Sequence, residues 1–144
     1  MGEFEDRFAE LEAARAEVIA LLRSCPAELL GRRPESDDWS VLENARHLIY
    51  AEQLHFRPFF TAPVRWSRIG MPTGGKPQRN GPGTEDTDDL EVVLETWDEV
   101  HAGVVAAVEV TRPPDALRHV DRNLRHLRAH ARGIRRLVER LAGS

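Results

Sequence analysis

One apolar pattern near the C-terminal end constrains the fold of this chain more than any other feature. Its members are separated by alternating intervals of three and four residues: Leu117, Val120, Leu124, Leu127, Ala131, Ile134, Val138 and Leu141. These intervals place them on one face of an α-helix, and Gly143 follows as a stop signal. No segment of the chain alternates with the period of two that half-buried strands show, so the sequence predicts helices throughout.

Three further segments carry the same helical signal. Residues 3–24 contain no Gly or Pro, and their apolar residues again recur at three and four. The second helix is expected to begin at a capping box made by Ser40 and Glu43 and to end near Pro58. Asp88 is the expected N-cap of the third helix, which ends before two consecutive prolines. Each of these segments is long enough to form one helix of a bundle.

A segment rich in Pro and Gly separates the second and third helices. Residues 61–86 carry four prolines and five glycines, a composition that does not support a regular helix. The length of 144 residues is about that of one domain. The sequence therefore predicts an all-α fold, a four-helix bundle with a long crossover between helices two and three, as a single domain over residues 1–144.

Composition and charge exclude several classes of function. The net charge is -4, which gives no overall positive field for nucleic acid. On the fourth helix we expect the arginines to cover the side opposite the histidines as a solvated face: Arg118, Arg122, Arg125, Arg132 and Arg136. No apolar run approaches the roughly 18 residues of a membrane-spanning helix, and the acidic start is unlike a secretory signal. We expect a cytoplasmic protein that binds neither membrane nor nucleic acid, with a homodimer as an open alternative.

Histidines are the strongest candidates for chemistry. The chain has one cysteine, Cys25, so any metal ion would be held by histidines or carboxylates. His126 and His130 stand four residues apart on one flank of the fourth helix, where two imidazoles can point at a common ion. His47 on the second helix is the natural third ligand. The alternative is that all three are ordinary interior histidines.

Other polar residues fall at apolar positions of the helices. His55 and His101 are expected as interior histidines with hydrogen-bond partners, while His119 is either an outer-shell group or a surface residue. Arg15 and Glu52 either form a partly buried ion pair or extend their charged ends to water. Glu52 is also a weak candidate for an acid or base near a metal.

The region around His47 resembles the DinB/YfiT-like superfamily of proposed metalloenzymes. The resemblance rests on residues 33–48, in which Trp39 and Ser40 precede a helix that carries His47 and Leu48. In that superfamily a Glu commonly follows the histidine by five residues, as Glu52 does here.

The resemblance continues to the end of the chain. A long third helix around Trp97 precedes the pair of His126 and His130, which stand where the superfamily has its HxxxH motif. One departure is Gly133, where many relatives have a Gln before the isoleucine. The resemblance implies a four-helix bundle with His47, His126 and His130 as ligands of a divalent metal, Zn first, with Ni, Fe, Co or Mn as alternatives.

The resemblance also implies a reaction. Characterised members of the superfamily are thiol transferases and a thiol-dependent isomerase that use mycothiol or bacillithiol. Three neutral imidazoles leave coordination positions open, as in catalytic zinc sites. The expected function is therefore transfer of a low-molecular-weight thiol to a small-molecule electrophile. The alternatives are a non-catalytic metal-binding or stress-associated protein, and a metal-dependent hydrolase with Glu52 as its only candidate base.

Overall fold

The chain folds into an all-helical bundle. The computed structural model describes residues 2–36, 38–70 and 87–143. Among these residues it contains no strand and four α-helices, which are α1 (Glu3–Ser24), α2 (Val41–Phe56), α3 (Leu90–Val110) and α4 (Ala116–Ala142). Two short 3-10 turns, η1 (Ala27–Leu29) and η2 (Arg57–Phe59), follow α1 and α2. The prediction of an all-α four-helix bundle is confirmed.

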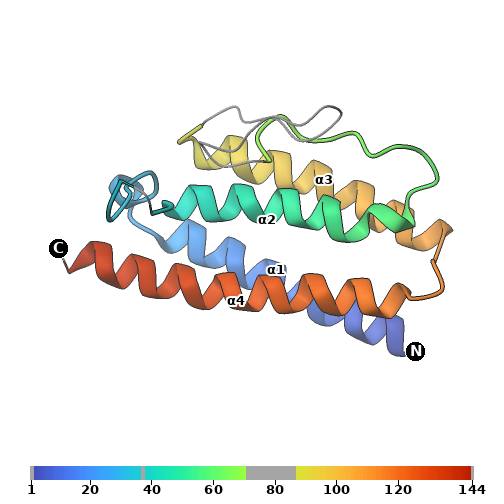
Figure 1. The fold of residues 1–144 in the computed structure, drawn as a ribbon. Coiled ribbons are helices and arrows are strands. Elements are labelled where there is room, and N and C mark those ends of the chain that lie inside the picture. Colours follow the sequence, from blue (N-terminus) through green and yellow to red (C-terminus); the bar gives the residue numbers. More distant parts are fainter. Residues whose placement is uncertain (1, 37, 71–86, 144) are drawn as a thin grey trace.

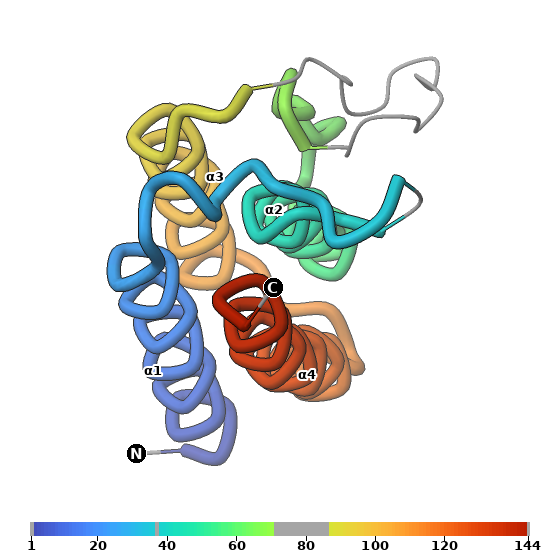
Figure 2. The backbone as a smooth tube through the Cα atoms, turned by 90° about the vertical axis from the view of Figure 1, so that its left-hand side faces the viewer, coloured from blue at the N-terminus to red at the C-terminus, as the bar shows by residue number. Residues whose placement is uncertain are grey.

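The four helices lie around one shared core. In Figure 1, α1 and α4 run side by side below α2 and α3, and the two chain ends lie at opposite ends of the bundle. Figure 2 looks along the helices and shows α2 above α4 and α3 above α1. Helix α4 packs on both α1 and α2, and α2 packs on α3. The apolar faces meet in the interior, where the largest fully buried side chain is Trp97.

The capping box at the start of α2 is confirmed. Ser40 Oγ accepts a hydrogen bond from the Glu43 backbone N–H at 3.1 Å, and Glu43 Oε1 accepts one from the Ser40 N–H at 3.1 Å. Arg33 donates to both carboxylate oxygens of Glu43 at 2.7 Å. Burial opposes ionisation of Glu43, but the hydrogen bonds from Arg33 and Ser40 outweigh it and hold the pKa of this carboxyl below its usual value. These bonds anchor the helix that carries His47.

The N-cap expected at Asp88 is wrong by one residue. Asp89 is the cap of α3, and its Oδ1 accepts hydrogen bonds from the backbone N–H groups of Glu91 at 3.0 Å and Val92 at 3.4 Å. Because Asp89 directly precedes the first helical residue, Leu90, its short side chain reaches these free N–H groups. Sequence alone does not distinguish two consecutive aspartates at a helix start.

The first part of the crossover is held against α2 by buried polar side chains. Arg46 is 1% exposed and donates from Nε to the Ile69 carbonyl oxygen at 3.0 Å. Gln53 donates to the Arg65 carbonyl at 3.0 Å and accepts from the Ser67 N–H at 3.0 Å. The connection after α2 therefore runs back along that helix (Figure 1). Residues 71–86 of the predicted crossover lie outside the described residues.

The ion pair between Arg15 and Glu52, one of the two alternatives for these residues, is not formed. Glu52 is 0% exposed and accepts hydrogen bonds from Trp97 Nε1 at 3.1 Å and, through its other oxygen, from His101 Nδ1 at 2.9 Å. Arg15 instead lies over the Trp97 ring, with Cζ 5.1 Å from the centroid, and bonds Asp98 at 2.7 Å. The Arg15 stem follows the core while its charged end bonds an exposed carboxylate, which agrees in part with the alternative interpretation. For Glu52 that alternative is wrong, because the side chain is fully buried and does not reach water.

Candidate metal centre

The structure brings together the three histidines that the sequence singled out. His47 on α2 and His126 and His130 on α4 each offer a ring nitrogen, and these nitrogens all lie within 4.8 Å of one another. The Nε2 atoms of His47 and His126 are 3.2 Å apart. A tetrahedral zinc ion with bonds of about 2.0–2.1 Å to nitrogen separates its ligand nitrogens by about 3.3 Å. The observed pair therefore fits two ligands of one ion.

A hydrogen bond from outside the cluster orients the third imidazole. His130 Nδ1 lies 3.0 Å from Asn44 Oδ1. An amide oxygen only accepts hydrogen bonds, so Nδ1 carries the hydrogen and Nε2 of His130 keeps its lone pair. This is the usual support for a metal-binding histidine, in which a carbonyl or carboxylate fixes the tautomer and the ring orientation. Asn44 lies three residues before His47 on α2. The same helix therefore supplies one candidate ligand, His47, and the hydrogen-bond acceptor that orients another, His130.

All three imidazoles are held in the neutral form. Burial, reinforced by the neighbouring histidines, lowers the pKa of His47 and of His130 to about 4. Burial and the positive charge of Arg122 lower the pKa of His126 as well. A metal ion binds the neutral imidazole, so no proton has to be displaced from these rings at neutral pH.

A cavity of about 430 Å³ opens beside the histidine cluster, lined by residues of α2 and α4: His47, Tyr50, Ala51, Leu54, His55, Arg122, Arg125 and His126. The expectation that Arg122 and Arg125 cover the side opposite the histidines is wrong. Arg122 precedes His126 by four residues, the spacing that also joins His126 to His130, so the two side chains are neighbours on the helix surface. Arg125 follows three residues after Arg122 and reaches the same cavity.

Aromatic rings continue along one side of the cluster. The Trp39 ring centroid lies 5.0 Å from that of His47, which lies 6.2 Å from that of Tyr50. Tyr50 in turn lies 5.8 Å from Trp66 of the crossover. Trp39 is 38% exposed, so its ring forms part of the outer surface next to His47. The cluster is thus reached from a surface that combines aromatic rings with guanidinium groups.

A family model described as the DinB superfamily matches residues 10–141. The chain belongs to the DinB superfamily. Comparisons with curated proteins and with solved structures returned no match. Across the parts of the chain that the structure describes, no helix is long and apolar enough to cross a membrane.

The remaining histidines of this DinB superfamily member are not part of the cluster. His55 is buried, and its Nδ1 lies 2.9 Å from Asn123 Oδ1. His101 lies between two carboxylates, with Glu52 at 2.9 Å and Glu12 at 2.8 Å. Both are interior histidines with partners, as expected. His119 is partly buried, with its Nε2 3.2 Å from Asp115 Oδ1 and its ring beside Phe59, so its partners lie outside the cluster.

The hydrogen-bond partners of Glu52 lie outside the histidine cluster. Its two carboxylate oxygens accept hydrogen bonds from Trp97 and His101 of α3, and neither donor is a member of the cluster.

Position 133, where relatives often carry Gln, provides no support to the cluster either. A Cβ added at Gly133 meets nothing within 4 Å. Among the described residues the supporting group is Asn44, which the sequence analysis missed, because only the pairing of α2 with α4 brings it to His130.

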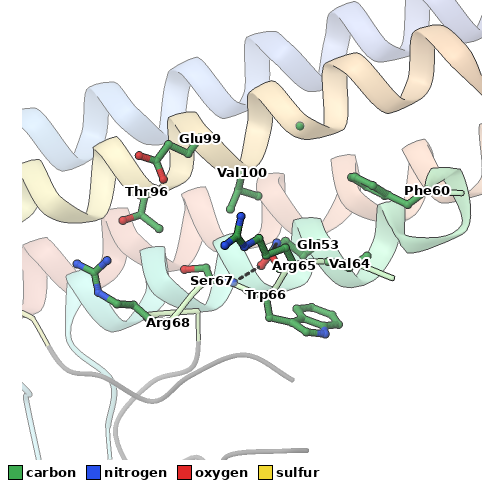
Figure 3. A pocket seen from close by; sticks show the side chains of 11 residues that line it. Gln53, Phe60, Val64, Arg65, Trp66, Ser67, Arg68, Thr96, Glu99 and Val100 are labelled. Atoms are coloured by element: carbon green, nitrogen blue, oxygen red, sulfur yellow. Dashed lines mark hydrogen bonds between the residues drawn. The ribbon is translucent and has the colours of Figure 1, made fainter. Parts of the chain in front are cut away.

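A second cavity of about 710 Å³ lies on the other side of α2, between the crossover and α3. Figure 3 shows Arg65 and Arg68 of the crossover reaching toward α3, while the Trp66 indole points the other way. Glu99 and Thr96 line this cavity from α3. No histidine lines this second cavity, so it does not include any residue of the histidine cluster.

Proposed function

We propose that this DinB superfamily protein is a metal-dependent thiol S-transferase. In this proposal His47, His126 and His130 hold a divalent metal, Zn first, and a low-molecular-weight thiol such as mycothiol or bacillithiol attacks a small electrophile next to it. The observation that carries the proposal is the convergence of three neutral imidazoles, two of which, His47 and His126, line an open cavity. Family membership supports the same interpretation at the level of a metalloenzyme.

The donor set suits thiol activation. Three neutral imidazoles add no negative charge, so a divalent cation held by them keeps its full charge and has coordination positions to spare. Bound there, the cation supplies Lewis acidity that favours the thiolate form of a thiol at neutral pH. Asn44 keeps the ring of His130 turned toward the cluster, and burial keeps His47 and His130 in the neutral form, each with one nitrogen lone pair.

The two alternative functions receive less support from the contacts. Hydrolysis needs a general base within reach of a water molecule, and the only carboxylate that the sequence offered for this role, Glu52, has both oxygens occupied by Trp97 and His101. A purely structural ion is usually enclosed by four protein ligands. Here the candidate ligands are three histidines, and two of them, His47 and His126, line a cavity.

The first experiment measures metal content. Untagged wild-type protein is reconstituted with Zn or Ni, dialysed and subjected to elemental analysis beside His126→Ala and His119→Ala. We expect about one equivalent of metal in the wild type and in His119→Ala, and almost none in His126→Ala. His119 is a matched control because it is a histidine of the same helix that bonds only Asp115. A wild type that stays metal-free after reconstitution contradicts the proposed function.

The second experiment measures transfer. Loaded protein is mixed with bacillithiol or mycothiol and chlorodinitrobenzene as a general electrophile. A carbon–sulfur bond forms, chloride leaves with the bonding electron pair, and the thiol proton passes to buffer. We expect product formation above the uncatalysed rate that disappears in His126→Ala and persists in His119→Ala. Metal binding without any transfer would leave the non-catalytic metal-binding protein as the better interpretation.

A further inference from the structure

We propose that the cavity beside the histidine cluster selects small organic anions, with Arg122 and Arg125 binding the carboxylate or phosphate group of the ligand. The inference names the substrate class of the site and therefore rests on the proposed function for its chemistry. The two guanidinium groups line the cavity whether or not a metal ion is bound, so their role can be tested separately.

The charge of the cavity lining supports the proposal. The lining contains two arginines and no acidic residue. In the described structure neither Arg122 nor Arg125 forms an ion pair or a hydrogen bond with a protein group. The acid next to them in sequence, Asp121, is already bound by Arg7 of α1. The two positive charges at the cavity are therefore available to a ligand.

Several other arginines of the bundle form ion pairs with carboxylates from neighbouring helices. Arg15 pairs with Asp98, Arg135 pairs with Glu17, and Arg23 pairs with Glu91 at 2.9 Å. The second cavity differs in the same respect, since it contains Glu99 beside its arginines. The cavity at the histidines thus combines unpaired guanidinium groups with a lining free of negative charge. The positive charge of this lining attracts an anion to the cavity and repels a cation.

The spacing on α4 suits recognition of one oxyanion. Arg122 and Arg125 are three residues apart and so project from adjacent turns of one helix face. A guanidinium presents several N–H donors in a planar fork that matches the oxygens of carboxylates and phosphates. The positive charge of Arg122 acts on His55 and His126, where it helps to lower the pKa of both, so this charge lies close to the cavity. An anion held here is positioned next to the imidazoles.

The rest of the lining favours an organic ligand over an inorganic ion. Ala51 and Leu54 add apolar surface, and Tyr50 adds an aromatic ring that continues to Trp66. A volume of about 430 Å³ lies within the range of roughly 300–1,000 Å³ that small-molecule sites have. A ligand with an anionic head and a small apolar or aromatic body matches both parts of the lining.

The test uses zinc-loaded protein and three probes that share a phenyl ring: benzoate, phenyl phosphate and neutral benzyl alcohol. Isothermal titration calorimetry gives the affinity of each. We expect at least one anion to bind about tenfold more tightly than benzyl alcohol, and this preference to be lost in the double variant R122Q/R125Q. The matched control R128Q/R132Q removes the same charge from exposed positions of α4 outside the cavity and should keep the preference. The better of the two anions identifies the head group.

Three outcomes overturn the inference. They are the absence of measurable anion binding to the wild type, an unchanged preference in R122Q/R125Q, and an equal loss in R128Q/R132Q, which would reflect net charge alone. Zinc content is measured for every variant, so failure of the metal site is detected separately. If the wild type holds no zinc, the same titrations on metal-free protein still test the arginine pair, because its position does not depend on the ion.

Discussion

A buried hydrogen-bond network around His101 allows a direct test of how burial sets the strength of a charged interaction. His101 of α3 is bonded by two carboxylates of the same type, Glu52 through Nδ1 at 2.9 Å and Glu12 through Nε2 at 2.8 Å. The Glu52 side chain is 1% exposed, whereas that of Glu12 is 41% exposed. Replacing each by Gln keeps the shape of the side chain and removes its charge.

The two replacements should differ several-fold in their cost. Glu52 also accepts from Trp97 Nε1, and a hydrogen bond to a buried charged group contributes about 1.5–3 kcal/mol. A neutral Gln keeps one acceptor but turns an N–H toward one of the two donors, so we expect Glu52→Gln to lower the free energy of unfolding by about 2–4 kcal/mol. Solvent screens the bond to Glu12, so Glu12→Gln should cost less than about 1 kcal/mol.

Urea unfolding followed by far-UV circular dichroism measures both costs. With a denaturant slope of about 2 kcal/mol per molar, Glu52→Gln should shift the midpoint down by about 1–2 M and Glu12→Gln by less than about 0.5 M. Metal content per folded molecule should stay at the wild-type level in both variants, since neither residue contacts the histidine cluster. Equal midpoint shifts for the two variants would refute the argument from burial.

Three further predictions concern single residues. Asn44→Ala should weaken metal binding about 10–100-fold in chelator competition, because His130 loses the partner that orients it; unchanged affinity would contradict this role. Burial lowers the pKa of His55 to about 4, so its contribution to stability is complete above about pH 6.5 and is lost as pH falls toward 4. His55→Gln should reduce the loss of unfolding free energy between about pH 7 and pH 4.5 by about 2 kcal/mol in urea titrations of metal-free protein, and an unchanged loss would argue against the shift. Gly133→Ala should raise the free energy of unfolding by about 0.5–1 kcal/mol, because its Cβ meets nothing within 4 Å in a helix interior; a lower urea midpoint would show a contact at this position.

Local signals in the sequence predicted the helices well. Periodic apolar residues and the absence of Gly and Pro defined α1, and the Ser40 and Glu43 pair defined the start of α2, because both signals act within one or two helical turns. The start of α3 was wrong by one residue, since Asp88 and Asp89 carry the same chemistry and only the backbone conformation selects between them. Errors of this size follow from signals that are shared by neighbouring residues.

Relations between helices were harder to predict from the sequence. Arg15 and Glu52 both stand at apolar positions, and an ion pair between them was reasonable. Instead Trp97 donates a hydrogen bond to Glu52, and the Arg15 guanidinium lies over the Trp97 ring. Asn44 had no recognisable signal as a partner of His130, because the two belong to different helices. The rotation of each helix about its axis decides such contacts, and periodicity defines that rotation only to within the width of an apolar face.

The sequence by itself determined the four helices, the shared face of His126 and His130, and the resemblance that pointed to His47. These depend on intervals of three and four residues along one helix, which backbone geometry converts directly into a common side. The tertiary structure alone decided that His47 Nε2 comes within 3.2 Å of His126 Nε2 and that Arg122 joins the same cavity. Distances between helices depend on how their side chains pack, and that packing is a property of the whole core rather than of any one segment.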